Sequence, residues 1–242
     1  YIATEPLPRT VDVPVEVVNT HEGRATLTYP VPANRSFFLP SDETPRPYRE
    51  ELFEDILDAL ALGIGDYYEK TGAFKLIGVS LSGGRDSLLT LLVAHRYADR
   101  ATGGKAGALL RAFHQPSRFS SKETLEGAVA ICRDLDVPLE IVSIDDAFER
   151  EMEAARAMLG GEELTEITKQ NIQARIRAQR MWNWSNTSAG LFLQTGNMTE
   201  KSVGYTTVGG DLMDALGVLA NGPKTGHGAA RLPLRKAWPR GN

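Results

Sequence analysis

Short apolar runs alternate along this chain with longer segments of helical periodicity, and this alternation restricts the possible fold more than any other feature. Four apolar runs predict strands, at Leu76–Leu81, Ala108–Phe113, Leu139–Ile144 and Leu191–Thr195. The intervening segments predict helices, at Arg49–Lys70, around Leu88–Val93, and at Leu125–Leu135, Phe148–Leu159 and Ile167–Thr187. Strands that alternate with helices predict an α/β fold, a doubly wound parallel sheet with helices on both faces.

Such a sheet directs attention to one edge, because ligands of open α/β sheets bind beyond the carboxyl ends of the strands. The groups that follow the four predicted strands are therefore the first candidates for a site. Cys132 lies inside a predicted helix and is expected to be a small core residue.

The composition excludes several classes of protein. A net charge of -4 does not favour a general nucleic-acid binder, and no apolar stretch is long enough to span a bilayer. The single cysteine forbids an internal disulfide, and no histidine pairs with it at zinc-ligand spacing. We therefore expect a cytoplasmic protein that works with neither nucleic acid nor membrane.

The strongest local signal is the loop Ser82-Gly83-Gly84-Arg85-Asp86-Ser87, which follows a predicted strand and opens a helix. Two glycines allow a sharp turn and a close backbone approach to a ligand, and the N–H groups of a helix N-terminus attract an anion. The two serines add hydroxyl donors. A carboxylate beside phosphate is explained by a divalent cation between them. The alternative is an ordinary helix N-cap with Asp and Ser in the first turn.

This loop differs from a Walker A loop and from Gly-x-Gly-x-x-Gly, and it resembles the Ser-Gly-Gly-x-Asp-Ser loop of the N-type ATP pyrophosphatases. Those enzymes have the adenine nucleotide alpha hydrolase-like fold, cut ATP between its α- and β-phosphates and transfer AMP to a substrate oxygen. The resemblance implies an ATP-binding segment that comprises Ser80, Leu81, Ser82, Gly83, Gly84, Arg85, Asp86 and Ser87.

Three further segments resemble NAD synthetases specifically: 116–121, 170–177 and 194–207. The resemblance implies that Ser117, Arg118 and Thr195 contact ATP. It also implies that Asn171, Arg175 and Glu200 bind the substrate deamido-NAD. On a helix Asn171 and Arg175 share a face, and an amide beside a guanidinium suits a carboxylate or a phosphate. Lys169, Gln173 and Arg177 are expected to form a solvated polar face.

The same resemblance assigns the charges of the reaction. Pro223-Lys224-Thr225 resembles a segment whose lysine contacts ATP phosphate, so Asp86 and Lys224 are the implied catalytic residues. Asp86 and Glu200 are the implied ligands of Mg²⁺. The implied activity is the ATP-dependent amidation of deamido-NAD to NAD through an acyl-adenylate, with release of AMP and pyrophosphate.

The implied partners are deamido-NAD, ammonia, and a glutaminase domain that supplies the ammonia; a homodimer or a higher homo-oligomer is also implied. The stretch 208–211 lacks the Lys-Tyr of ammonia-dependent members, which places the chain nearer the glutamine-dependent group, and a lysine contact cannot be carried over to Val208. Two alternatives remain: another N-type pyrophosphatase such as a GMP synthetase, and a nucleotide-binding module without chemistry.

The two ends differ from the middle of the chain. Residues 1–47, which begin at Tyr1 rather than a methionine, are rich in proline and are expected to form an arm that follows an absent glutaminase domain, with a short strand pair around Val11–Val18 and Arg24–Tyr29. Residues 48–225 form the predicted synthetase domain. The family's apolar helix is missing from 226–242, and reading one base later restores a helix-like string, so we predict a frameshift near codon 226, with weak ATP binding and slow turnover.

Overall fold

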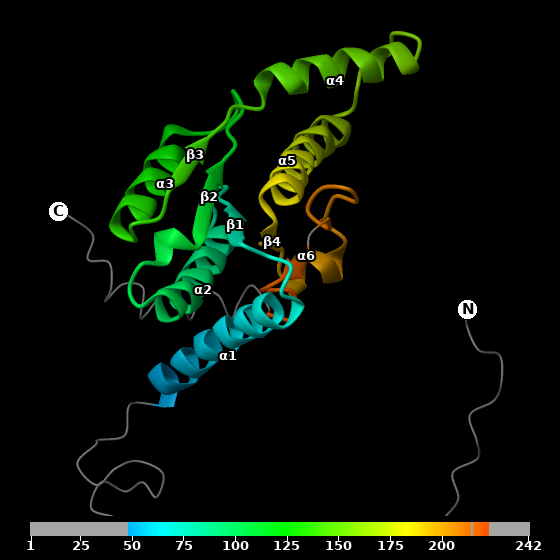
Figure 1. Ribbon diagram of the computed structural model, residues 1–242. Helices are drawn as coiled ribbons and strands as arrows, with labels where there is room; N and C mark the ends of the chain where they lie inside the picture. Colours follow the sequence, from blue (N-terminus) through cyan, green and yellow to red (C-terminus); the bar gives the residue numbers. More distant parts are fainter. Residues whose placement is uncertain (1–47, 214, 223–242) are drawn as a thin grey trace, which may run out of the picture. The chain divides into compact units, whose positions relative to one another are not determined.

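The computed structural model describes residues 48–213 and 215–222 (Figure 1). The predicted arm with its strand pair, Lys224 and the tail at 226–242 lie outside the described residues. The sheet has five strands in the order β3-β2-β1-β4-β5, and every neighbouring pair is parallel. The predicted doubly wound α/β fold is therefore confirmed.

The elements follow the predicted alternation closely. The strands are β1 (Leu76–Ser80), β2 (Leu110–His114), β3 (Leu139–Ile141), β4 (Gly190–Gln194) and β5 (Leu216–Gly217). The helices are α1 (Tyr48–Thr71), α2 (Arg85–Thr102), α3 (Lys122–Asp134), α4 (Asp145–Met158), α5 (Glu166–Ser188) and α6 (Met198–Val203), with a 3-10 turn at Ala106–Ala108. Among residues 48–213 and 215–222, no helix is long and apolar enough to cross a bilayer.

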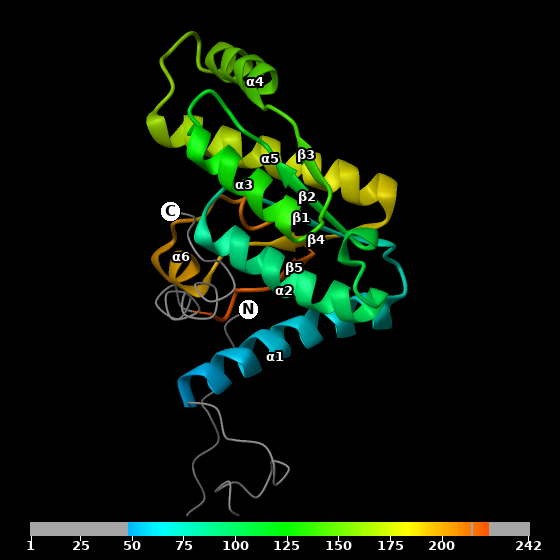
Figure 2. The same ribbon diagram turned by 90° about the vertical axis from the view of Figure 1, so that its left-hand side faces the viewer.

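The strand order places a crevice beside β1. The chain adds β2 and β3 on one side of β1, and β4 and β5 on the other, so the connections diverge at β1 and β4. Helices α2 and α3 cover one face and α5 covers the other (Figure 1). Helix α1 packs against α2 on the outside of its layer (Figure 2), and α4 packs against α5.

Two glycines let α5 approach the sheet closely. Gly78 and Gly190 lie on neighbouring strands, and a Cβ at either position would come within 2.4 Å of the Trp184 ring. The ring also meets Phe113 edge-on, with 5.0 Å between the ring centroids. An indole seated on two glycines therefore lets the backbone of α5 lie close to the sheet.

The two largest errors in the predicted strand boundaries have local reasons. The third strand ends at Ile141 rather than Ile144, because Ile144 turns inward, is fully buried and precedes α4. Ala108 belongs to the 3-10 turn, where its N–H donates to the carbonyl of Lys105 at 2.8 Å. Cys132 is buried as expected, and burial raises the pKa of its thiol to about 11.

Arg96 of α2 holds α1 in place. Its guanidinium donates to both carboxylate oxygens of Asp58, at 2.7 and 2.8 Å, and to Glu54 at 2.7 Å. Arg96→Ala is expected to lower the free energy of unfolding by roughly 1.5–3 kcal/mol, because its charged hydrogen bonds to Asp58 and Glu54 are lost and only Arg100 still pairs with Asp58. Urea denaturation measures this change.

The control is Lys70→Ala, which removes the exposed pair with Asp66 and should change stability by less than about 0.5 kcal/mol. The hydrogen bond from Arg96 lowers the pKa of Asp58, so this stability is present above the ordinary carboxyl range and is lost as the pH falls through the lowered pKa. Equal losses in the two variants, or an unchanged acid response in Arg96→Ala, would contradict this role.

Candidate active site

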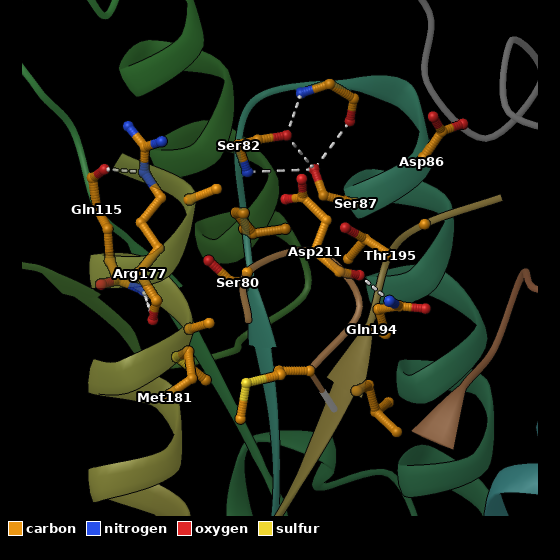
Figure 3. A pocket seen from close by; sticks show the side chains of 18 of the residues that line it. Ser80, Ser82, Asp86, Ser87, Gln115, Arg177, Met181, Gln194, Thr195 and Asp211 are labelled. Atoms are coloured by element: carbon orange, nitrogen blue, oxygen red, sulfur yellow. Dashed lines mark hydrogen bonds between the residues drawn. The ribbon is translucent and has the colours of Figure 1, made fainter. Parts of the chain in front are cut away.

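A pocket of about 470 Å³ opens at the carboxyl ends of β1, β2 and β4, where the strand order predicts a ligand site (Figure 3). The loop after β1 forms one wall, and α5 forms another. The segment 205–213 supplies Tyr205, Gly210, Asp211 and Met213. Of the predicted site residues, the pocket is lined by Ser80, Leu81, Ser82, Gly84, Asp86, Ser87, Thr195 and Glu200.

The loop after β1 is shaped by its own serines. The Ser87 hydroxyl donates to the Gly84 carbonyl at 3.0 Å and accepts from the Ser82 N–H at 3.2 Å. The Ser82 hydroxyl accepts from the Gly84 N–H at 3.1 Å and bonds the Ser87 hydroxyl at 3.1 Å. Figure 3 shows these hydrogen bonds at the N-terminus of α2. Both hydroxyls thus build the loop, and Ser87 is buried beneath it.

Gly83 makes the turn possible. Its φ is +81°, in the left-handed region, and an added Cβ would lie 2.5 Å from the Cβ of Thr124 on α3. Gly84 then begins α2 with an extended backbone and no side-chain cap. Gly84 is thus the N-cap residue of α2 and Asp86 lies in the first turn, as the alternative of an ordinary N-cap also expects.

Two carboxylates enter the pocket from distant parts of the chain. Asp86 lies in the first turn of α2, on the side of the pocket where Thr195 lies (Figure 3). Glu200 lies in α6, and both side chains line the pocket. Asn197 connects them: its Nδ2 donates to Asp86 Oδ2 at 3.1 Å, and its Oδ1 accepts from the Glu200 N–H at 3.0 Å.

Within the part of the chain that the structure describes, no group of three or more His, Cys, Asp or Glu side chains is arranged to hold a metal ion. Asp86 and Glu200 supply two carboxylates, and Mg²⁺ typically takes one or two carboxylates with substrate phosphates and water. The donor set therefore fits a magnesium ion that arrives with a polyphosphate.

The opposite wall carries a cation that the sequence did not reveal. Arg177 donates from Nε to the Gln115 carbonyl at 3.0 Å, and the Gln115 amide donates back to the Arg177 carbonyl at 3.4 Å. Burial lowers the pKa of the Arg177 guanidinium, while the negative charge of Asp211 raises it. Figure 3 shows Arg177 on one side of the pocket and Asp211 nearer its middle.

The expectation of a solvated face on α5 is wrong for two of its three residues. Arg177 lines the pocket, and Gln173 accepts from the Ser117 hydroxyl at 3.0 Å. Lys169 makes a local pair with Glu166, between Nζ and Oε1 at 2.6 Å. The error arose because α5 contacts the loops after β2 and β4 along its polar side.

Several predicted residues lie outside the pocket lining. Asn171 accepts from the Thr207 hydroxyl at 2.8 Å, and Arg175 donates to the Val208 carbonyl at 3.1 Å, so both hold the segment 205–213. The shared face of Asn171 and Arg175 on one helix is thus confirmed.

The other displaced residues lie around the loops. Ser117 bonds α5, as described above. Arg118 forms ion pairs with Asp145 and Glu149 of α4. Arg85 and Gly83 are exposed, and neither residue lines the pocket.

Pocket residues that the sequence did not single out come mainly from strand ends. His114, Gln115 and Gln194 end or follow β2 and β4, and all three are buried. The rule that ligands lie beyond carboxyl ends of strands points to these positions, although it does not select among them. Asp211 is the exception, because its segment has no regular structure to place it.

A parallel sheet with this strand order, and with a pocket between a glycine loop and two carboxylates at the carboxyl ends of its strands, defines a doubly wound α/β protein. The sequence profile of the NAD synthase family matches residues 56–229. The chain belongs to the NAD synthase family.

Two curated relatives are glutamine-dependent NAD(+) synthetases. The one from Thermotoga maritima is 34% identical over 181 residues, which cover 75% of this chain and 29% of the relative. The one from Aquifex aeolicus is 35% identical over 192 residues, covering 75% of this chain and 31% of the relative. The chain thus spans less than a third of the length of these relatives.

A similar solved structure is the glutamine-dependent NAD+ synthetase of Acinetobacter baumannii, in complex with adenosine diphosphate. Its TM-score is 0.67 at 30% identity, with 78% of this chain and 33% of that chain covered. The ammonia-dependent NAD synthetase of Campylobacter jejuni shares the fold, with a TM-score of 0.61 at 24% identity over 78% of this chain and 75% of that chain.

Proposed function

We propose that this chain is the ATP-cleaving synthetase part of a glutamine-dependent NAD synthetase, which converts deamido-NAD to NAD. The observation that carries the proposal is that Asp86 and Glu200 line the same pocket as the loop Ser82–Ser87, within the family match. A relative with adenosine diphosphate bound supports a nucleotide as the ligand.

The carboxylate of deamido-NAD would have to lose oxide, which is a poor leaving group, so the reaction must first replace it with a better one. A carboxylate oxygen of deamido-NAD attacks the α-phosphorus of ATP, and pyrophosphate leaves. The resulting acyl-adenylate has AMP as its leaving group, and ammonia attacks its carbonyl to give the amide. The protein contributes mainly position and charge neutralisation to both steps.

The pocket divides these tasks among its walls. The backbone of Ser82, Gly83 and Gly84 turns directly before the N-terminus of α2. The N–H groups of this helix N-terminus would stabilise the departing pyrophosphate. Asp86 and Glu200 would hold Mg²⁺, which offsets the charge that develops on the phosphates. Thr195 and Arg177 line the pocket and are placed to hold the nucleotide, and Lys224 is proposed as a further phosphate contact.

Deamido-NAD is assigned to the region of Asn171 and Arg175. Both side chains hold the segment 205–213, which also supplies Asp211 to the pocket wall. The second substrate therefore binds next to this segment. Ammonia would come from a glutaminase domain, and assembly as a homodimer or higher oligomer belongs to the same proposal.

Arg175→Ala is expected to weaken the binding of deamido-NAD by roughly 1.5–3 kcal/mol, the usual contribution of a charge-assisted hydrogen bond. ATP affinity should change little. Calorimetry with each ligand separately measures the two effects. The control is Arg180→Ala on the same helix, which loses a bond to the Ser143 carbonyl at 2.7 Å outside the pocket. Equal losses for both ligands in Arg175→Ala would mean a structural role.

The proposed substrate is tested by offering three candidates in turn: deamido-NAD, xanthosine monophosphate and tRNA. Pyrophosphate release from ATP that depends on deamido-NAD alone supports the proposal. Release with xanthosine monophosphate or tRNA instead would assign another pyrophosphatase activity. A chain that binds ATP but releases no pyrophosphate with any of the three would be a nucleotide-binding module.

A further inference from the structure

Asn197 contacts both carboxylates of the site and is itself completely buried, with 0% of its surface exposed. It lies between β4 and α6, and its amide group reaches Asp86, which is 111 positions earlier in the chain. Its own N–H donates to Glu200 Oε2 at 3.3 Å. One side chain and its backbone therefore bond to both pocket carboxylates.

Capping of α6 explains only half of these contacts. A capping box needs an acceptor side chain at Asn197 and a carboxylate at Glu200, and both bonds of the box are present. Serine and threonine would serve as well for that purpose. The remaining contact is the donation from Nδ2 to Asp86. A serine or threonine hydroxyl lies one bond closer to the backbone than Nδ2 and would have to make both contacts from a single oxygen atom.

The contact from Asn197 Nδ2 to Asp86 matters energetically because the amide is buried. A buried donor without a partner costs roughly 1–3 kcal/mol, so the Nδ2 group fixes the carboxylate that accepts from it. Asp86 lies in a first helical turn and Glu200 in another helix, and the two helices belong to different crossovers of the sheet. Asn197 is thus a direct hydrogen-bonded link between the two carboxylates.

We propose that Asn197 is a positioning residue, which orients Asp86 and Glu200 so that both can hold one divalent cation with the phosphates of the nucleotide. This inference rests on the proposed function. Groups that orient metal ligands typically change metal affinity about 10-fold to 100-fold when they are lost.

The test compares Asn197→Ser with Asn197→Ala in the full chain. Serine keeps an acceptor for the α6 cap but lacks the longer amide group whose Nδ2 reaches Asp86, whereas alanine lacks both the acceptor and the amide. The probe is Mn²⁺ with α,β-methylene ATP, which cannot be cleaved at the proposed bond, and the readout is the electron paramagnetic resonance of bound and free Mn²⁺. Both variants are expected to bind Mn²⁺ about 10-fold to 100-fold more weakly in the ternary complex.

Stability separates positioning from capping. Thermal denaturation should show a lower melting temperature for Asn197→Ala than for Asn197→Ser, although both lose Mn²⁺ affinity alike. Thr165→Ala is the control, since Thr165 is the N-cap of α5 and lies outside the pocket lining. Its hydroxyl accepts from the Thr168 N–H at 3.3 Å, and alanine removes this bond. It should leave Mn²⁺ binding unchanged.

Wild-type Mn²⁺ affinity in a folded Asn197→Ser would overturn the positioning role and leave the proposed function standing. Failure of the unmutated chain to bind Mn²⁺ with the analogue would instead count against the proposed metal site itself. An independent measurement needs no variant: the side-chain amide signal of Asn197 in nuclear magnetic resonance should shift when Mg²⁺ joins the bound analogue. An unmoved signal in a complex that does bind Mg²⁺ would also overturn the inference.

Discussion

Asp86→Asn is expected to abolish ATP cleavage, with pyrophosphate release at least about 100-fold slower, while the fold stays intact. The substitution keeps the volume of the side chain. In the unmutated chain Asn197 Nδ2 donates to Asp86 Oδ2 at 3.1 Å, and the new amide oxygen can still accept this hydrogen bond. The charge is lost, however, and the proposed cation at the phosphates loses one of its two carboxylates. Pyrophosphate release at saturating Mg²⁺ and circular dichroism measure the two effects.

The matched control is Asp66→Asn, a carboxylate-to-amide change at an exposed pair with Lys70 on α1. It should leave pyrophosphate release unchanged. Near-normal release by a folded Asp86→Asn would refute the role of Asp86 in the reaction, whatever the metal content of the assay.

Gly83→Ala should have the second largest effect, a loss of the loop's structure and with it of nucleotide binding. A left-handed φ of +81° disfavours any residue with a Cβ by about 1–2 kcal/mol. The new methyl would also lie 2.5 Å from the Cβ of Thr124, and overpacking of this kind costs typically 1–3 kcal/mol. Calorimetry with ATP should show binding at least about 10-fold weaker than in the unmutated chain.

Gly127→Ala provides the comparison. Gly127 lies in α3 with the same Thr124, and a Cβ there would meet no atom within 4 Å. Alanine in a helix is about 1 kcal/mol better than glycine, so this variant should be as stable as the parent or more so, with normal ATP binding. Unchanged ATP affinity in Gly83→Ala would show that the turn tolerates a side chain and that the loop does not depend on glycine.

The central strands could be predicted from the sequence because they are buried on both faces. Every residue of β4 is buried, so its apolar run is nearly continuous. The edges could not be predicted as well. Strand β3 has exposed residues at its end. Strand β5 consists of Leu216 and Gly217, and a strand of this length is too short to give a periodic signal. Their pairing is decided by the neighbouring strands.

The candidate site divides in the same way. The loop around Gly83 and Gly84 could be predicted because its chemistry is local to six consecutive residues. Arg177 could not, since its place on a polar helical face is typical of a solvated residue, and only the packing of α5 on the sheet leaves it half-buried in the pocket wall. The link from Asn197 to Asp86 joins two distant segments, and one sequence alone contains no signal for such a contact.

Oxygen isotope transfer tests the central claim most directly. Deamido-NAD labelled with ¹⁸O in its nicotinate carboxylate is mixed with ATP, Mg²⁺ and ammonium, with the chain in excess over ATP so that slow turnover still registers. The account predicts that AMP carries one ¹⁸O from the carboxylate and that the amide of NAD keeps the other. Unlabelled AMP, or label recovered in pyrophosphate or phosphate, would contradict attack at the α-phosphorus and with it the acyl-adenylate.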